Sequence, residues 1–452
     1  MTRPRAPLVV AGAGIAGLTA ARVAARHGAP VVCFEASGRL AGMASTEVDA
    51  DGHIFDLGAH FITNRLAASV GVGARCRPVR RYAEAVLLDG HVRRYPLGLL
   101  AEPRFLAGAL AARLRPPPGP PASAAELARR SYGRPFATRV AIPLLERWSG
   151  MPATDLAPAA LEKVPGSVAG TVGLWLASRL LRRAVAIGYC ATQPQSPWVH
   201  HVYPEGGVAT VCEALAAQVR AAGGRIHLER PVTAIVLDGD RVVGVRTADG
   251  AEVATDRVVS TAPITRLGAL CGGHPHLDRF RALRFRALVL VNLVLTGRDV
   301  LPEVMVWFPD HRPVFRATET TRAAPWLAPP DRSIVVCDLG AEVGDATWIA
   351  GDDALAAAAA GALADLVPGI ERRVVGVRVM RVPFAYPLFR RVDEPLRRRI
   401  DDGTGIRGLL SVGRSGRFRH DLMEDVHWRT TALVTDWLRQ GARDGPAPPP
   451  SR

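Results

Sequence analysis

Three glycines and one glutamate near the start of the chain are spaced for nucleotide chemistry. The glycines follow the pattern Gly12-x-Gly14-x-x-Gly17, and Glu35 comes later in the same region. Gly12 permits a tight turn, Gly14 lets backbone amides approach a pyrophosphate, and Gly17 lets a helix pack closely against a strand. Glu35 can accept hydrogen bonds from ribose hydroxyls, and its charge disfavours a 2′-phosphate. Together these four residues predict a dinucleotide site.

Two apolar runs and an alanine-rich stretch flank the glycines and must hold them in place. The run at 8–10 precedes the glycines, a helical stretch follows to about Gly28, and a second run at 31–34 ends at Glu35. Strand, glycine turn, helix, strand and acid therefore occur in the order that a dinucleotide-binding unit needs. The helix N-terminus adds unpaired N–H groups and a partial positive charge that favour phosphate.

The residues after Glu35 add further spaced residues to the dinucleotide-binding pattern. An enzyme that binds only a nicotinamide dinucleotide does not require them. The chain resembles the flavoprotein superfamily of amine oxidases, protoporphyrinogen oxidases and UDP-galactopyranose mutases, whose pattern reads E-x-x-x-R-x-G-G followed by G-x-x-F-D-x-G-x-H. The matching residues are Glu35, Arg39, Gly42, Phe55, Asp56, Gly58 and His60. Ala41 departs from the pattern, because the first glycine of the pair is expected there. The resemblance implies FAD as the cofactor, bound in part by Arg39, Gly42 and Gly58.

A second stretch that resembles this superfamily lies near the C-terminus, in residues 409–425. Here the resemblance implies a late strand, a turn at Gly413-Arg414, and a helix near Met423 whose N-terminus faces the isoalloxazine ring. A guanidinium beside a glycine turn suits a pyrophosphate, since the charge pairs with phosphate and the glycine admits the backbone. The resemblance also places the backbone of Val232 against the adenine. This C-terminal pattern is more similar to the mutase and protoporphyrinogen oxidase branch than to phytoene desaturases.

Three residues are candidates for catalysis. The resemblance places His60 close to the isoalloxazine, where it would stabilise a reduced-flavin anion or accept a substrate proton; the alternative is a packing histidine bonded to backbone. Arg316 and Tyr386 fall in segments expected to line the substrate cavity, the alternative being a surface arginine. Many amine oxidases of this superfamily use a lysine that holds a water near the flavin. The one lysine here, Lys163, lies outside that region, so we expect this arrangement to be absent.

The expected fold is an α/β fold: a glutathione-reductase-like FAD-binding Rossmann domain with an inserted substrate domain of mixed helices and β-sheet. A hairpin is predicted around Asp89-Gly90, and a three-strand meander over 233–260 with turns at Asp238-Gly239 and Asp249-Gly250. The low apolar content after Gly441 predicts a disordered tail. The expected segments are 1–95, 196–285 and 386–440 for the FAD domain, 96–195 and 286–385 for the substrate domain, and 441–452 for the tail.

The amino-acid composition limits the kinds of binding partner that we expect. The net charge is +15, but arginine supplies 56 of the 57 basic residues, a bias typical of a GC-rich coding genome. An anionic substrate or an anionic membrane surface are the alternatives, and no nucleic-acid motif accompanies the charge. The longest apolar stretch, 164–181, contains Arg179, so no membrane span is expected, although peripheral contact is allowed. Six scattered cysteines and the lack of a signal peptide indicate a cytoplasmic protein without disulfides or a metal site.

Three functions fit these residues. The leading one is an FAD-dependent biosynthetic oxidoreductase that dehydrogenates a C–N or C–C bond of a small-molecule substrate, with oxygen or another electron acceptor reoxidising the flavin. The second is a redox-neutral mutase acting on a nucleotide sugar, in which reduced flavin is the nucleophile. The third is a flavin-binding scaffold without activity, which the departure at Ala41 and the missing lysine would favour.

Overall fold

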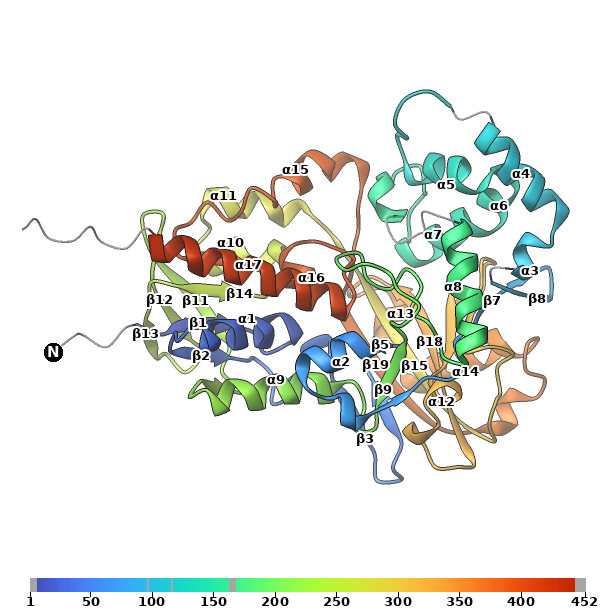
Figure 1. Cartoon of the computed structure of the whole chain (residues 1–452), viewed down its shortest axis with the longest axis horizontal. Helices are drawn as coiled ribbons and strands as arrows, with labels where there is room; N and C mark the ends of the chain where they lie inside the picture. The colour runs from blue at the N-terminus through green and yellow to red at the C-terminus, as the bar shows by residue number, and fades with distance from the viewer. Residues whose placement is uncertain (1–5, 96, 115–116, 162–167, 444–452) are drawn as a thin grey trace, which may run out of the picture.

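A parallel five-stranded sheet joins segments from both ends of the chain. The computed structural model describes residues 6–95, 97–114, 117–161 and 168–443 (Figure 1). The strand order is β10-β2-β1-β14-β20, and all four pairings are parallel. The strands are β1 (Leu8–Ala11), β2 (Val31–Phe34), β10 (Arg225–His227), β14 (Val258–Ser260) and β20 (Leu409–Ser411). The two central apolar runs are buried on both faces, as is typical of parallel strands.

Three helices cover one face of this sheet, with α1 between the other two (Figure 1). They are α1 (Ile15–Arg26), α9 (Ala209–Ala221) and α17 (Met423–Arg443). Their shared core includes Leu18, Leu215 and Val434, all fully buried. Because α17 continues through Arg443, the first residues of the expected disordered tail are helical; residues 444–452 lie outside the described part of the chain.

The predicted meander covers the opposite face of the sheet, with one correction. It consists of β11 (Val232–Asp238), β12 (Arg241–Thr247) and β13 (Glu252–Ala254), which pair antiparallel. The third strand was expected to run to Ser260, but residues 258–260 leave the meander and form β14. Their apolar run pairs with β1 in register Val9↔Val258, which buries it inside the parallel sheet.

A seven-stranded mixed sheet forms the second lobe, in the order β19-β15-β18-β17-β16-β7-β8. Helix α14 (Asp352–Leu363) shares a hydrophobic core with one face of this sheet, and Phe55 shares a core with Leu288 and Leu290 on the other. The strands are β7 (Glu84–Leu88), β8 (His91–Arg94), β15 (Phe285–Thr296), β16 (Met305–Trp307), β17 (Arg316–Glu319), β18 (Arg332–Ala341) and β19 (Val374–Pro387).

The expected boundary between the two domains at residue 95 is wrong, because the hairpin before this residue belongs to the second lobe. The hairpin itself is confirmed, since β7 and β8 pair antiparallel across Asp89-Gly90, both with positive φ. However, β7 pairs in parallel with β16 and so belongs to the second lobe. The pairing is reinforced by Trp307, whose indole Nε1–H donates to Glu84 Oε2 at 2.8 Å.

The helices within residues 97–181 form a separate group on the right-hand side of Figure 1. Its members are α3 (Leu97–Leu100), α4 (Pro103–Leu114), α5 (Ala124–Tyr132), α6 (Arg134–Phe136), α7 (Ile142–Ser149) and α8 (Val168–Leu181), and α4 to α7 lie at its top. The fold is completed by β3 (Thr46–Val48), β4 (Ile54–Asp56), β5 (Ile62–Thr63), α2 (Asn64–Val70), β6 (Cys76–Pro78), β9 (His201–Pro204), α10 (Ile264–Leu270), α11 (Pro275–Asp278), α12 (Thr320–Ala323), α13 (Ala346–Ile349), α15 (Glu394–Arg398) and α16 (Gly413–Gly416). Of the helices in the described ranges, none combines the length and apolar content needed to cross a bilayer.

Candidate functional site

The glycine turn between β1 and α1 is built so that only glycine fits at two of its positions. At Gly12 the φ angle is +107°, and an added Cβ would lie 2.0 Å from Thr261 Oγ1. A Cβ at Gly17 would lie 1.8 Å from the Gly12 carbonyl oxygen. Gly14 differs, because a Cβ there would meet nothing closer than 3.6 Å. Helix α1 has no capping side chain and no acid in its first turn, so its N-terminus can receive an anion.

Glu35 lies beside this turn and is held there by hydrogen bonds. Its Oε2 accepts from the Ala13 backbone N–H at 2.7 Å, and its Oε1 accepts from the Ser37 N–H at 2.9 Å. The segment that leads into β11 is tied to the same place, since the Arg230 N–H donates to the Glu35 carbonyl at 2.8 Å. Val232, the first residue of β11, therefore follows a segment anchored at the end of β2.

Ala41 adopts the conformation that the expected glycine would have taken. Its φ is +85°, that of Gly42 is +53°, and Ala41 forms a parallel bridge with Gly14. An alanine in this left-handed region costs about 1 kcal/mol relative to glycine. The substitution therefore keeps the backbone path and brings Gly42 against Gly14, where a Cβ on Gly42 would lie 3.5 Å from Gly14 Cα.

The Arg39 side chain pairs with Glu47 rather than with a group at the glycine turn. Its Nη2 donates to Glu47 Oε1 at 2.7 Å, its side chain is 61% exposed, and Glu47 also pairs with Arg378 of the second lobe. The structure thus does not bring the Arg39 guanidinium to the glycine turn in this conformation. Gly58 has φ +100°, and a Cβ on it would lie 3.6 Å from His60 Nε2 and 3.8 Å from Leu290 Cδ1.

The C-terminal turn meets the N-terminal turn directly. Gly413 has φ +85°, and a Cβ there would lie 2.8 Å from Ala16 Cβ in the first turn of α1. Arg414 extends from this turn, donates from Nη2 to the Ala385 carbonyl at 2.6 Å, and lies over the Tyr386 ring at 4.9 Å. Its Nε–H is buried without a partner among the described residues. Burial lowers the pKa of Arg414 from its ordinary value, so this charge favours a nearby anion.

Met423 begins helix α17 and packs into the core that α1 shares. The next two residues are buried carboxylates with protein partners. Glu424 accepts from Thr63 Oγ1 at 2.8 Å and from Arg65 Nε at 2.6 Å, and Asp425 accepts from the Ala191 N–H at 2.8 Å. The start of α17 is therefore fixed to neighbouring elements.

Arg316 and Asp338 form a buried ion pair in the second lobe. They lie opposite each other on β17 and β18, and Arg316 Nη2 donates to Asp338 Oδ2. Asp338 is fully buried and Arg316 is 15% exposed. Burial lowers the pKa of Arg316, but Asp338, with smaller contributions from Tyr386 and Tyr82, raises the pKa above its ordinary value. Arg316 Nε and Asp338 Oδ1 are buried without partners among the described residues, so the guanidinium keeps a free donor.

Sequence reasoning missed the residues that hold Arg316. Its guanidinium stacks over Trp307 at 5.2 Å, and Trp307 donates to Glu84, which also accepts from the Tyr82 hydroxyl at 2.7 Å. A signal for Asp338 was present in the sequence, since it is the one acid in the mainly apolar run 333–340. Nothing local in the sequence indicates that Trp307 and Glu84 are neighbours.

His60 has one hydrogen bond that orients its imidazole, and its lowered pKa favours the neutral ring. Its Nε2 lies 2.9 Å from the Leu57 carbonyl, so Nε2 carries the proton and Nδ1 is left as an acceptor. Burial lowers the pKa of His60, and the charges of Arg414 and Arg316 act in the same direction against the opposing effect of Asp56. The two arginines are therefore near enough to bias the imidazole.

His60, Arg316, Tyr386 and Arg414 converge on one region between the lobes. Tyr386 packs against Trp148 at 5.4 Å and His420 at 5.9 Å, beneath Arg414, and it is among the groups that influence the pKa of Arg316. All four convergent residues are partly exposed. Three of the four were candidates for catalysis, and Arg414 was a candidate for cofactor binding. Lys163 lies outside the described residues.

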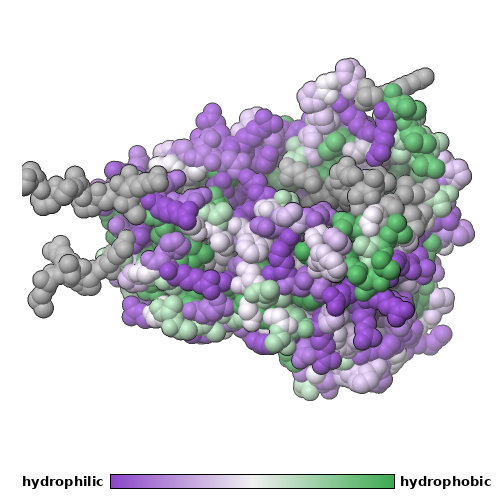
Figure 2. Space-filling view, in the orientation of Figure 1, coloured by the Kyte–Doolittle hydropathy of each residue, from purple (hydrophilic) through white to green (hydrophobic). Residues whose placement is uncertain are grey.

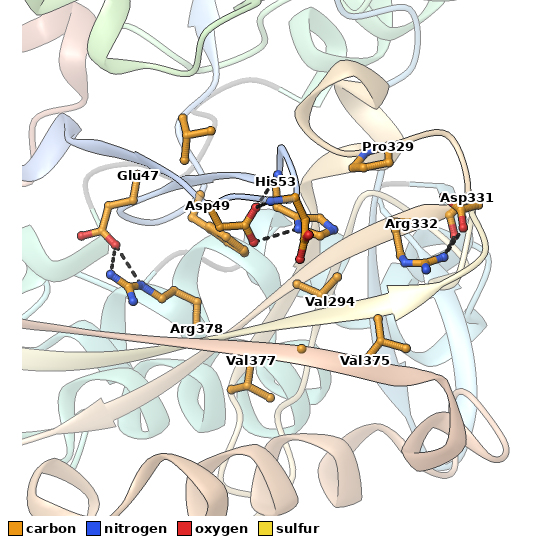
Figure 3. A pocket seen from close by; sticks show the side chains of 14 residues that line it. Glu47, Asp49, His53, Val294, Pro329, Asp331, Arg332, Val375, Val377 and Arg378 are labelled. Atoms are coloured by element: carbon orange, nitrogen blue, oxygen red, sulfur yellow. Dashed lines mark hydrogen bonds and ion pairs between the residues drawn. The ribbon is translucent and has the colours of Figure 1, made fainter.

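A groove that the structure shows lies away from these four residues. It has a volume of about 550 Å³ and runs between the β3–β4 hairpin and strands β15 and β19 (Figure 3). Its charged residues pair with one another, as Glu47 does with Arg378 and Arg332 with Asp331. Asp49 closes the hairpin turn by accepting from the Asp51 and His53 N–H groups. None of the predicted site residues lines this groove.

Because two histidines are buried, we expect the protein to lose stability at acidic pH. Burial lowers the pKa of His201 and of His427 to about 4, from about 6.5 in an unfolded chain. Below pH 6.5 the unfolded chain takes up these protons while the native protein does not. Stability is therefore expected to fall by up to about 3 kcal/mol for each histidine between pH 6.5 and 4.

Denaturant unfolding as a function of pH measures this loss. His201→Phe preserves the ring packing with Tyr82 and Tyr189 and is expected to flatten the dependence by about half. The matched control is His91→Phe on exposed β8, which should leave the dependence unchanged. An equal pH dependence in wild type and His201→Phe would show that this ring does not contribute.

Comparison with known proteins agrees with this geometry. A family model described as flavin containing amine oxidoreductase matches residues 15–414. Among solved structures, reduced UDP-galactopyranose mutase aligns with a TM-score of 0.77 and 16% identity, over 97% of this chain and 94% of that one. No curated protein matches the sequence significantly.

Two further solved structures share the fold. A protein titled putative protoporphyrinogen oxidase from Exiguobacterium aligns with a TM-score of 0.72 and 18% identity, over 97% of this chain and all of that one. Cyclohexylamine oxidase from Brevibacterium oxydans aligns with a TM-score of 0.68 and 16% identity, over 96% of this chain and all of that one. The family model covers most of the chain, and the chain therefore belongs to the flavin containing amine oxidoreductases and is an FAD-dependent oxidoreductase.

Proposed function

We propose that FAD lies along the junction of the two glycine turns, in a glutathione-reductase-like arrangement of the first lobe. The support is a cradle that added Cβ atoms would fill at Gly12, Gly17 and Gly413, together with the uncapped N-terminus of α1. In this arrangement the pyrophosphate faces Gly14, and Glu35 faces the adenosine ribose. Arg414, with a buried unpartnered Nε–H, supplies positive charge near the flavin.

The remaining cofactor residues have supporting roles in this proposal. Gly42 keeps the backbone close to Gly14, Gly58 keeps the chain close to the flavin, and Val232 lies at the adenine end. Met423 holds the start of α17 against α1. Arg39 would have to exchange its partner Glu47 for the cofactor in order to bind it.

We propose that the enzyme dehydrogenates a C–N or C–C bond of a small anionic metabolite. The observation that carries this proposal is the unpartnered donor of Arg316, a residue of the second lobe whose charge lies near enough to His60 to lower its pKa. Bound FAD would accept a hydride from the substrate carbon. Arg316 would hold a carboxylate or carbonyl group, Tyr386 would pack against the substrate, and His60 Nδ1 would accept the proton released from the adjacent nitrogen or carbon.

A redox-neutral mutase acting on a nucleotide sugar is the second candidate. It is favoured by the presence of two largely buried guanidinium groups, Arg316 and Arg414, because a substrate pyrophosphate would suit this charge. The structural likeness to a protein titled UDP-galactopyranose mutase supports the same candidate.

Anaerobic stopped-flow absorbance separates the candidates. The holoprotein is mixed with a panel of amines, amino acids and other carboxylates, and separately with nucleotide sugars. Bleaching of the oxidised flavin by one of the first group is expected for the oxidoreductase. Conversion of a nucleotide sugar only after reduction by dithionite would identify the mutase. If neither reaction occurs, the protein is a flavin-binding scaffold without activity. NADPH should not reduce the flavin rapidly, because of the two G-x-G-x-x-G stretches only 12–17 lies between a strand and a helix; the other, 403–408, leads into strand β20.

A further inference from the structure

Helix α4 exposes a stripe of leucines to solvent. Leu106, Leu110 and Leu114 recur at every fourth position and so lie on one side of the helix, and they are 46%, 53% and 81% exposed. The helix is anchored from its opposite side by Phe105, which is 3% exposed and packs against Phe136. Exposure of several large apolar side chains on one helix face marks an interaction surface.

Helix α8 exposes a second apolar stripe. Leu176 and Leu180 are 55% and 84% exposed, and the Arg179 guanidinium lies over the Trp175 ring at 5.0 Å. Hydrophobic surface over α4 and α8 appears on the same face of the molecule in Figure 2. Stacked arginine and tryptophan side chains combine an apolar body with a polar end, the chemistry of a water–lipid boundary.

The charged residues on these two helices are all basic. Neither α4 nor α8 contains an aspartate or a glutamate. Arg113 on α4, Arg179 on α8, and Arg182 and Arg183 after α8 are exposed, and no carboxylate pairs with any of them in the described ranges. A leucine surface with unpaired arginines is complementary to an anionic bilayer, where each basic side chain adds electrostatic attraction.

We propose that α4 and α8 form a docking surface for an anionic lipid bilayer, on which the protein lies without crossing it. A second copy of the chain is the less suitable occupant, since a two-fold contact through this surface would place arginines against arginines. The proposal does not depend on which reaction the enzyme performs.

Co-sedimentation of the holoprotein with vesicles tests the proposal. Phosphatidylcholine vesicles containing phosphatidylglycerol are expected to bind the protein, and pure phosphatidylcholine vesicles to bind it much more weakly. The double variant Leu110→Glu/Leu180→Glu should weaken binding at least tenfold. Arg179→Gln and Arg183→Gln should each weaken it about fivefold, and added salt should act in the same direction.

The matched control is Val48→Glu, which changes a valine that is 63% exposed on β3, away from α4 and α8. It should bind vesicles as the wild type does. Unchanged flavin absorbance and melting temperature establish that each variant is folded. The proposal is overturned if anionic vesicles do not sediment the wild type, or if Val48→Glu weakens binding as much as the leucine variant. It is also overturned if the leucine variant abolishes a concentration-dependent dimer and vesicles do not bind, since the surface would then belong to a second copy.

Discussion

Gly14→Asp is expected to yield a colourless protein that FAD does not reconstitute. A Cβ at this position meets nothing closer than 3.6 Å, so the first atom of the aspartate side chain fits. Its carboxylate would face the pyrophosphate at the N-terminus of α1. Like charges placed together in an interface cost several kcal/mol, so the affinity for FAD should fall at least about 100-fold.

The measurement is the flavin-to-protein ratio after purification, followed by a titration of apoprotein with FAD. Gly14→Asn is the matched control, since asparagine has nearly the same volume without the charge, and it should lose less affinity than the aspartate variant. Equal losses in both variants would show that space rather than charge decides binding. A yellow Gly14→Asp protein would contradict the proposed location of the pyrophosphate.

The glycine turn could be predicted because its determinants are local. Gly12, Gly14, Gly17 and Glu35 lie within one strand–helix–strand unit, so their spacing alone defines their relation. The resemblance predicted a cofactor-binding turn at Gly413-Arg414, but the contact of Gly413 with α1 was not predicted, because the two segments are at opposite ends of the chain. The substitution Ala41 was also interpretable only in the structure, where its φ of +85° shows that the glycine conformation is kept.

The residues that we expect to contact the substrate could be predicted only in part. Arg316 and Tyr386 were predicted to line the substrate cavity, and this stays a prediction; the structure places Arg316 near His60 and Tyr386 beneath Arg414. Asp338 and Glu84 were missed because they meet Arg316 and Trp307 through cross-strand register, which a sequence does not state. The same reason explains the wrong boundary at residue 95, since the parallel pairing of β7 with β16 joins segments more than two hundred residues apart. Arg39 shows the reverse case, a motif residue whose charge has found a different partner.

Replacing Arg316 is expected to affect stability and catalysis by separate routes. Arg316→Gln alone leaves the fully buried Asp338 without its partner, and breaking a buried pair in this way costs about 3–5 kcal/mol. A lower melting temperature would therefore accompany any loss of activity, and this variant cannot distinguish the two roles. The double variant Arg316→Gln/Asp338→Asn removes both charges and allows an amide–amide hydrogen bond. It should recover most of the lost stability.

The double variant then tests the role of the guanidinium in substrate binding. If Arg316 positions an anionic substrate, the folded, yellow double variant should reduce its flavin at least about 30-fold more slowly with a substrate found in the panel, a loss of about 2–4 kcal/mol. Asp338→Asn is the control that keeps the arginine, and it should retain most of the rate. Tyr386→Phe, which preserves the ring beneath Arg414, should have a smaller effect. A wild-type rate in the stable double variant would make Arg316 a structural residue, and the mutase candidate would lose the phosphate clamp on which it depends.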